Sequence, residues 1–210
     1  MRNLSDCRLY GIVDLSYVAI DQVGHVTRAM IEGGVDLIQL RGKTQPVDQL
    51  MELAGSIEQM TSASGIPFII NDRAEIAAKV PVTGVHVGQD DDSIAHARKK
   101  AGRQLLIGKS THSLEQAIAA QREGADYIGF GPIFATPTKP DYQPIGSTGI
   151  KRVNNDVSVP IFCIGGIKID NLGEIIAAGA KRVAIVSGLL KSPDIAKYAR
   201  ACKALLNPET

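Results

Sequence analysis

Short apolar runs rich in Ile and Val recur at regular intervals along the chain, and the stretches between them have the spacing of helices. This alternation restricts the fold more than any other feature, because it is typical of strand and helix units in a parallel sheet. Eight strands are expected, at residues 9–14, 36–41, 67–72, 84–89, 105–110, 126–131, 160–166 and 182–188. A helix is expected after each strand, near residues 21–33, 46–63, 73–79, 92–101, 113–123, 147–155, 170–178 and 193–206. Eight such units favour a closed (β/α)8 TIM barrel, with an open doubly wound sheet as the alternative.

The whole chain, residues 1–210, is expected to form this single α/β domain. No linker divides it, and a content of 44% hydrophobic and 21% charged residues is sufficient for one large core. The net charge of +1, with both signs interspersed, gives no field that would gather nucleic acid or an anionic membrane. The expected partners are therefore small-molecule substrates. The sequence does not determine the oligomeric state, and it is compatible with a homo-oligomer.

Cysteine usage and the apolar stretches bear on the compartment. The three cysteines form an odd set without metal-ligand spacing, which is typical of a reducing environment. The first residues lack the apolar segment of a signal peptide, and apolar stretches such as residues 183–190 are too short to span a bilayer. We therefore expect a cytoplasmic protein, with Cys163 packed in its core. His86, between two valines of an expected strand, is interpreted as a hydrogen-bonded interior residue.

Polar side chains follow the expected strands where each strand ends. In the stretch IQLRGK, Gln39, Arg41 and Lys43 occupy alternate positions, so they would project from one face of an extended chain. The other strand ends carry Asn71 and Asp72, then Gln89, Asp90 and Asp91, then Ser110, Thr111 and His112. Because TIM barrels place their sites at the carboxyl ends of the strands, we expect these side chains to converge. The alternative for Asp72 and Ser110 is that they cap helices.

These groups divide into anion-binding and cation-binding sets. Four side chains could surround a highly charged phosphate group: Arg41, Lys43, Asn71 and Lys139. Asp72 and Asp91 would be out of place beside that anion unless a cation lay between them, and Mg²⁺ typically binds one or two carboxylates together with substrate phosphates. Gly165 and Gly166, with the VSG turn after the last strand, form the usual place for a monophosphate in such barrels. The alternative is that the acidic and basic groups form unrelated parts of the rim.

The connection at residues 132–148 is long for a loop between a strand and a helix, and it contains four prolines. Long loops in compact domains are usually functional or disordered. Its polar residues Thr136, Thr138 and Lys139 are typical of a lid that closes over phosphate.

In seven successive motifs the sequence resembles the thiamine phosphate synthase family, also called thiamine-phosphate pyrophosphorylases. The motifs are QLRGK, NDRAEIA, GVHVGQDD, IGKSTHS, ADYIGFGPIFATPTK, PIFCIGGI and GAKRVAIVS. The resemblance implies a (β/α)8 barrel in which Gln39, Arg41, Lys43, Asn71 and Lys139 hold pyrophosphate and Asp72 and Asp91 hold Mg²⁺. It implies a substrate contact at Ser110 and thiazole phosphate contacts at Thr136, Thr138, Gly166, Ile185, Val186 and Ser187. Two positions depart from the family pattern, since Gly42 replaces the usual Glu and Val13 the usual Thr.

The implied reaction is an alkyl transfer, in which hydroxymethylpyrimidine diphosphate loses pyrophosphate and the thiazole phosphate nitrogen attacks the resulting cation. Lys139, Ser110 and His112 are our candidate catalytic residues. The sister family of thiazole tautomerases shares the barrel and a segment similar to STHS, with His as the acid and base catalyst. That activity is the main alternative, although this chain keeps Asp91 and Lys139. A barrel without activity that binds a thiamine intermediate as a regulator is the second alternative.

Overall fold

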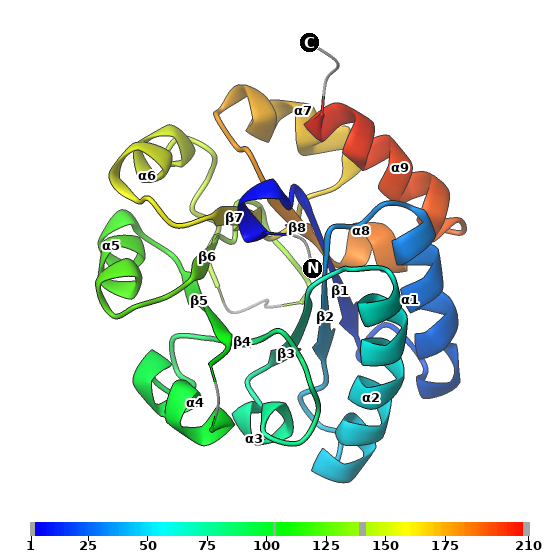
Figure 1. The fold of residues 1–210 in the computed structure, drawn as a ribbon. Helices are drawn as coiled ribbons and strands as arrows, with labels where there is room; N and C mark the ends of the chain where they lie inside the picture. The colour runs from blue at the N-terminus through cyan, green and yellow to red at the C-terminus, as the bar shows by residue number, and fades with distance from the viewer. Residues whose placement is uncertain (1–2, 103, 139–141, 208–210) are drawn as a thin grey trace.

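A computed structural model describes residues 3–102, 104–138 and 142–207, and they form a closed barrel of eight parallel strands in sequence order (Figure 1). The strands are β1 (Leu9–Asp14), β2 (Leu37–Arg41), β3 (Phe68–Asn71), β4 (Gly84–Val87), β5 (Leu106–Thr111), β6 (Tyr127–Phe130), β7 (Ile161–Ile164) and β8 (Val183–Ile185). Since β1 pairs with both β2 and β8, the predicted (β/α)8 barrel is confirmed and the open doubly wound sheet is wrong.

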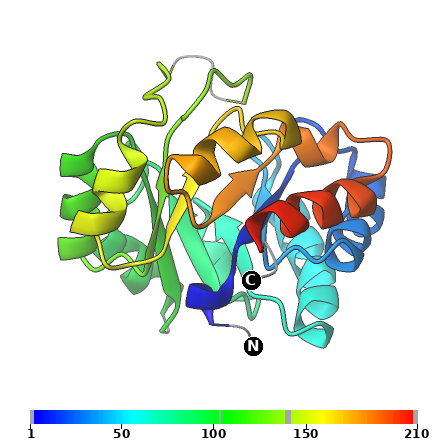
Figure 2. The same cartoon turned by 90° about the horizontal axis from the view of Figure 1, so that it is seen from above.

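Helices surround the barrel (Figures 1 and 2). They are α1 (Val23–Glu32), α2 (Val47–Ala63), α3 (Ala74–Ala77), α4 (Ile94–Ala101), α5 (Leu114–Arg122), α6 (Ile150–Asp156), α7 (Ile169–Ala177) and α9 (Ile195–Leu206). Three short elements were not predicted: η1 (Leu4–Asp6), η2 (Ile20–Gln22) and α8 (Ser187–Leu190), which directly follows β8. Side chains of Ser93 and Ser113 cap α4 and α5. The predicted alternative that Asp72 or Ser110 caps a helix is wrong, because α3 has no side-chain cap and Ser110 lies within β5.

The apolar core has two parts, because every strand is covered on both faces. Outward-facing residues of the strands pack against the helices in the larger part. Inside the barrel, Tyr10, Tyr127 and Phe162 meet edge to face, with ring centroids 5.3–6.1 Å apart. This aromatic cluster fills the interior below the carboxyl ends of the strands. The barrel interior is therefore a packed core.

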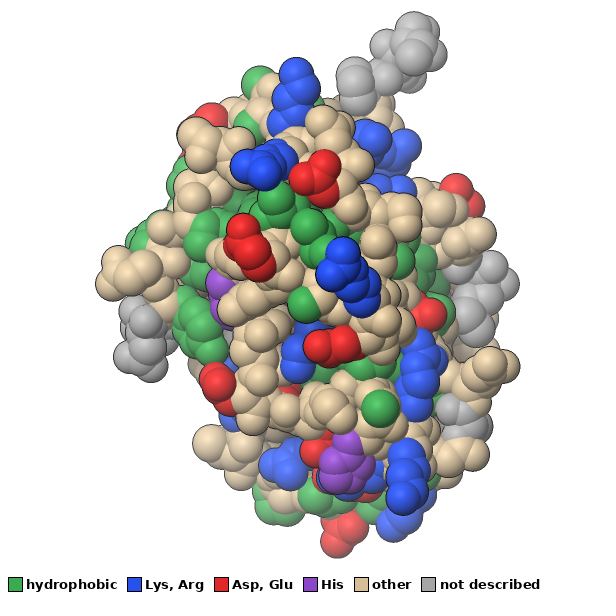
Figure 3. All heavy atoms as spheres, turned by 90° about the vertical axis from the view of Figure 1, so that its left-hand side faces the viewer, with side chains coloured by type: hydrophobic (Ala, Val, Ile, Leu, Met, Phe, Trp, Pro, Cys, Tyr) green, Lys and Arg blue, Asp and Glu red, His purple; other side chains and the backbone are tan. Residues whose placement is uncertain are grey.

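The two ends of the barrel differ. Figure 2 shows the chain termini at one end and the connection between β6 and α6 rising from the other. Charges of both signs are interspersed on the face drawn in Figure 3. Within the described part of the chain, no helix is long and apolar enough to cross a membrane.

A candidate active site at the carboxyl end of the barrel

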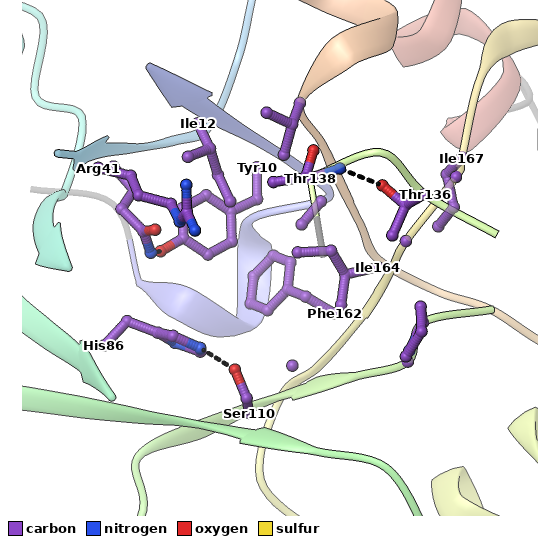
Figure 4. Close-up of a pocket in the computed structure, with 18 of the residues that line it drawn as sticks. Tyr10, Ile12, Arg41, His86, Ser110, Thr136, Thr138, Phe162, Ile164 and Ile167 are labelled. Atoms are coloured by element: carbon purple, nitrogen blue, oxygen red, sulfur yellow. Dashed lines mark hydrogen bonds between the residues drawn. The ribbon is translucent and has the colours of Figure 1, made fainter. Parts of the chain in front are cut away.

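A pocket that is continuous with solvent opens at the carboxyl ends of the strands (Figure 4). Its lining contains ten of the predicted site residues: Gln39, Arg41, Asn71, Ser110, His112, Thr136, Thr138, Gly166, Val186 and Ser187. The predicted convergence of these strand ends is therefore observed. Lys139 lies outside the described residues.

Arg41 is held by a carboxylate that the sequence analysis did not single out. Arg41 ends β2 and pairs in register with Asp14, the last residue of β1. Arg41 Nη1 donates to Asp14 Oδ2 over 2.7 Å, and the Asp14 side chain is only 1% exposed. Asp14 also accepts hydrogen bonds from the backbone N and Oγ of Ser16, over 3.0 and 2.8 Å. Asp14 thus fixes the guanidinium at the wall of the pocket, and its position at a strand end was the signal that could have identified it.

Lys43 lies between the two predicted metal ligands. Its Nζ donates to Asp72 Oδ2 and lies 3.7 Å from Asp91 Oδ1. Asp72 has a positive φ of 61°, in the left-handed region that Asp tolerates better than most residues. Asp91 is oriented by a bond from Gly88 N to its Oδ2 over 2.9 Å, and the Gly88 carbonyl accepts from the buried Lys109 Nζ over 2.6 Å. The two carboxylates therefore face one position that a cation can occupy.

The pKa of Asp72 reflects this arrangement. Burial raises the pKa of Asp72 above its ordinary value of 3.8, the hydrogen bond from Lys43 lowers it, and the neighbouring Asp91 raises it further. Two carboxylates with one shared cation position suit Mg²⁺, which completes its shell with water and phosphate oxygens. In the described ranges, no group of three or more His, Cys, Asp or Glu side chains is arranged to hold a metal. The observed donors thus fit a magnesium ion that also needs a ligand's oxygens.

The opposite side of the pocket is built from backbone. Gly165 and Gly166 have φ values of 98° and 63°, where residues other than glycine are strained. A Cβ at Gly166 would lie 2.6 Å from the carbonyl oxygen of Ala135, so the two loops are in close contact. Beside them, after the neighbouring strand β8, Ser187 begins α8, and the first amides of a helix have no acceptor within it. Backbone N–H groups on this surface can donate hydrogen bonds to the oxygens of a small anion.

Both ends of the connection between β6 and α6 are attached to other loops at the mouth of the pocket. Before residue 139, Thr138 Oγ1 is hydrogen-bonded to Tyr17 Oη over 3.1 Å. After residue 141, Tyr142 Oη donates to Asp90 Oδ2 over 3.2 Å, and its ring lies 4.6 Å from that of His112. The described residues on either side of 139–141 therefore lie on the β1 side and on the β4 side of the mouth.

The two histidines of the pocket differ in their hydrogen bonding. His86 is 9% exposed, with Nδ1 3.2 Å from Tyr127 Oη and Nε2 3.0 Å from Ser110 Oγ. The interpretation of His86 as a hydrogen-bonded interior residue is confirmed, but the sequence analysis missed its position in the pocket lining. His112 Nδ1 donates to the carbonyl of Gly131, which leaves Nε2 as the unprotonated nitrogen of the neutral ring. Among the described residues, that buried Nε2 has no hydrogen-bond partner.

Four of the predicted residues in the described ranges do not line the pocket: Lys43, Asp72, Asp91 and Ile185. The first three form the ion cluster at its edge. Ile185 is 1% exposed and belongs to the outer core, while its neighbours Ala184 and Val186 face the barrel interior. The expected phosphate contact of Ile185 is therefore limited to its backbone. Cys163 is 1% exposed, as expected, and burial raises the pKa of its thiol to about 12.

Comparisons with known proteins agree with this geometry. The sequence profile described as thiamine monophosphate synthase matches residues 9–189. A thiamine-phosphate synthase of Chloroflexus aurantiacus is 41% identical over 206 residues, which cover 98% of this chain and 95% of that protein. One from Shouchella clausii is 40% identical, with 95% and 96% covered. The solved structure of a thiamine phosphate pyrophosphorylase from Pyrococcus furiosus superimposes with a TM-score of 0.89 at 31% identity, over 97% of each chain. The chain therefore belongs to the thiamine monophosphate synthase family.

Proposed function

We propose that the protein is a thiamine-phosphate synthase, a transferase that joins 4-amino-2-methyl-5-hydroxymethylpyrimidine diphosphate to thiazole phosphate. The products are thiamine phosphate and pyrophosphate. The observation that carries the proposal is the meeting of opposite charges at one edge of the pocket. There Lys43 lies against Asp72 and Asp91, next to the β2 and β3 ends that carry Arg41 and Asn71. A diphosphate with a bound cation is a ligand that matches both signs of charge.

In the proposed reaction the two substrates meet in this pocket. The Arg41 guanidinium, fixed by Asp14, and the Lys43 ammonium are the donors for the diphosphate on the β2 side. The glycine turn after β7 and the start of α8 would hold the thiazole monophosphate on the other side, with Thr136 and Thr138 beside it. The two phosphate groups would thereby fix the ring nitrogen and the methylene carbon facing each other, which is the main requirement of the transfer.

Departure of pyrophosphate leaves a pyrimidine-methyl cation. The main role of the protein in this reaction would therefore be to stabilise the charges that develop on the two products of that step. Arg41 and Lys43 would stabilise the negative charge that grows on the leaving group. The apolar walls formed by Ile12, Phe162 and Ile164 would exclude water that otherwise traps the cation. Mg²⁺, when bound by Asp72 and Asp91, would supply further positive charge at the diphosphate.

A second candidate activity is thiazole tautomerisation, and His112 is the observation that favours it. Its Nε2 is buried and, among the described residues, without a partner, so it could accept a proton from a bound thiazole. The ion cluster of Lys43, Asp72 and Asp91 has no evident use in that reaction. For this reason we propose the synthase activity and treat the tautomerase as the alternative to be tested.

The test mixes both substrates with Mg²⁺ and measures thiamine phosphate and pyrophosphate. Formation of both in equal amounts, lost on removal of the metal with EDTA, supports the proposal. His112→Ala should slow this reaction without abolishing it. Isomerisation of a carboxylated thiazole phosphate that needs His112, with no pyrophosphate released from the full mixture, would instead establish the tautomerase.

We also propose that the protein works in the cytoplasm. Its cysteines Cys7, Cys163 and Cys202 are all buried free thiols. Free thiols persist in a reducing compartment. Fractionation of the source cells with an antibody against the protein would test this location.

A further inference from the structure

A chain of polar side chains crosses the otherwise aromatic interior of the barrel, and all of them except Tyr127 also line the pocket. Gln39 Nε2 donates to Tyr10 Oη. Tyr10 Oη lies 3.1 Å from Tyr127 Oη, which lies 3.2 Å from His86 Nδ1. His86 Nε2 lies 3.0 Å from Ser110 Oγ, at the pocket wall (Figure 4). The five residues come from β2, β1, β6, β4 and β5, so only closure of the barrel brings them together.

The direction of these hydrogen bonds follows from the donor at one end. An amide nitrogen can only donate, so Tyr10 Oη is an acceptor toward Gln39. The Tyr10 proton then finds its acceptor in Tyr127 Oη, and the Tyr127 proton finds its acceptor in His86 Nδ1. Any reversed bond along this path leaves a buried hydroxyl proton without an acceptor in the chain, which is costly. Burial raises the pKa values of both tyrosines, so both keep the protons that this arrangement needs.

The histidine tautomer is therefore determined by the tyrosines. Because Nδ1 accepts from Tyr127, the neutral ring carries its proton on Nε2 and donates it to Ser110 Oγ. Ser110 Oγ, having accepted this bond, is left with its own proton to donate. Ser110 lines the pocket, so that proton is available to a ligand.

The packing around these hydrogen-bonded side chains leaves room for them to meet. Gly108, the interior residue of β5 before Ser110, leaves the space in which Tyr127 and His86 meet. A Cβ at this position would overlap the Tyr127 ring and lie 2.5 Å from His86 Nδ1. Phe162 packs edge to face on both tyrosine rings, with centroids 5.3 and 5.8 Å away.

We infer that Gln39, Tyr10, Tyr127 and His86 act as one hydrogen-bonded chain that makes Ser110 a donor toward an acceptor atom of the substrate. Tyr10, Tyr127 and His86 are thus positioning residues, which act through Ser110. The inference rests on the proposed function in one respect, because the substrate is taken to be the pyrimidine diphosphate. The tautomer of His86 in the free protein does not depend on that function.

The first experiment measures this tautomer by NMR on protein labelled with ¹⁵N in its histidines. Correlations between ring protons and nitrogens distinguish the protonated nitrogen from the bare one. The expected result for the wild type is a proton on Nε2 of His86 and a bare Nδ1. A proton on Nδ1 would overturn the inference, because the chain would then run in the opposite direction and Ser110 would donate to His86.

Variants test whether the tyrosines set the tautomer. In Tyr127→Phe and in Tyr10→Phe the Nδ1-protonated form should appear, since the constraint from Gln39 no longer reaches the ring. Phe162→Leu is the matched control, as it disturbs the same aromatic cluster without removing a hydroxyl, and its tautomer should remain that of the wild type. An unchanged tautomer in Tyr10→Phe, or an equal change in Phe162→Leu, would show that the chain does not control His86.

A double-mutant cycle tests the connection to Ser110. Tyr127→Phe should lower kcat/KM roughly 10-fold, the usual effect of one lost hydrogen bond. In the Ser110→Ala background the same change should lower kcat/KM less than twofold. Independent effects of the two substitutions would overturn the positioning role. A protein with the expected tautomers that makes no thiamine phosphate would contradict the proposed function and leave the directed chain intact.

Discussion

Replacing Lys43 with Met should strengthen Mg²⁺ binding to the free protein, although Lys43 is itself a predicted phosphate ligand. The Lys43 ammonium contacts Asp72 and lies 3.7 Å from Asp91, so it occupies the position between the carboxylates that a metal needs. A bound ion must displace it. In Lys43→Met this competition is absent, while the long apolar stem is kept.

The magnitude follows from the exposure of the pair. The Lys43 side chain is 46% exposed, and those of Asp72 and Asp91 are 15% and 30% exposed, so solvent screens both contacts. Exposed ion pairs contribute about 0.2–1 kcal/mol each, so two give about 0.4–2 kcal/mol. Since 1.4 kcal/mol corresponds to a factor of ten, Mg²⁺ affinity should rise about 2- to 30-fold. Affinity for pyrophosphate in saturating Mg²⁺ should fall instead, by about 10-fold or more, because a charged donor is lost.

Calorimetric titration with MgCl2, without phosphate, measures the first effect, and titration with pyrophosphate in saturating Mg²⁺ measures the second. Lys79→Met is the matched control, because it removes the same charge from an exposed position after α3. Asp72→Asn supplies the background without a site. Equal or weaker Mg²⁺ binding in Lys43→Met, with Lys79→Met unchanged, would refute the idea that Lys43 competes with the metal.

Three further outcomes are expected. Asp72→Asn should lose Mg²⁺ binding without losing thermal stability, because the substitution removes a desolvated charge and Asn tolerates the positive φ. A magnesium titration and a thermal unfolding scan of the variant would measure the two effects. Mg²⁺ affinity, measured at a series of pH values, should weaken as the pH is lowered through the raised pKa of Asp72, because the native state holds that proton more tightly and it competes with the metal. In the metal-free protein the contribution of Asp72 to stability should be greatest below its ordinary pKa of 3.8 and should be lost as the pH rises through the raised pKa. In urea unfolding, Gly108→Ala should destabilise the protein by about 1–3 kcal/mol, because the added carbon overlaps Tyr127. Gly173→Ala in α7 should stabilise the protein by about 0.5–1 kcal/mol, because no atom lies within 4 Å of the added carbon.

The parts of the site that sequence predicts are those that depend on local periodicity. Alternation along β2 directs Gln39 and Arg41 to the same side of the strand, and both line the pocket as expected. The same reasoning, applied to β8, would have placed Ile185 on the outer face, opposite Val186. The resemblance identified both residues as ligand contacts without regard to this alternation. In the structure the Ile185 side chain is buried in the outer core, so only the backbone of this residue can face a ligand.

Sequence could not predict the partnerships between strands. Tyr10 and Tyr127 are separated by 117 positions, and each is an ordinary aromatic residue of a buried strand when viewed locally. Asp14 ends its strand like the other polar residues, but its role depends on registration with Arg41 across the sheet. The contact of Lys43 with Asp72 likewise depends on two loops whose conformations no periodicity specifies. Such contacts come from barrel closure and register, which are set by the whole fold.

Two glycines in the barrel strands lie beside the polar chain that ends at Ser110. Gly108 and Gly129 lie within β5 and β6, where glycine weakens a strand and is usually a sign of close approach by another group. Here the group that approaches is His86, with Cε1 3.5 Å from a Cβ built at Gly129 and Nδ1 2.5 Å from one built at Gly108. The interior of these strands is therefore left open for a ring contributed by β4. Gly108 thus creates the space for the polar chain, whereas a Cβ at Gly129 would lie in ordinary van der Waals contact with the His86 ring.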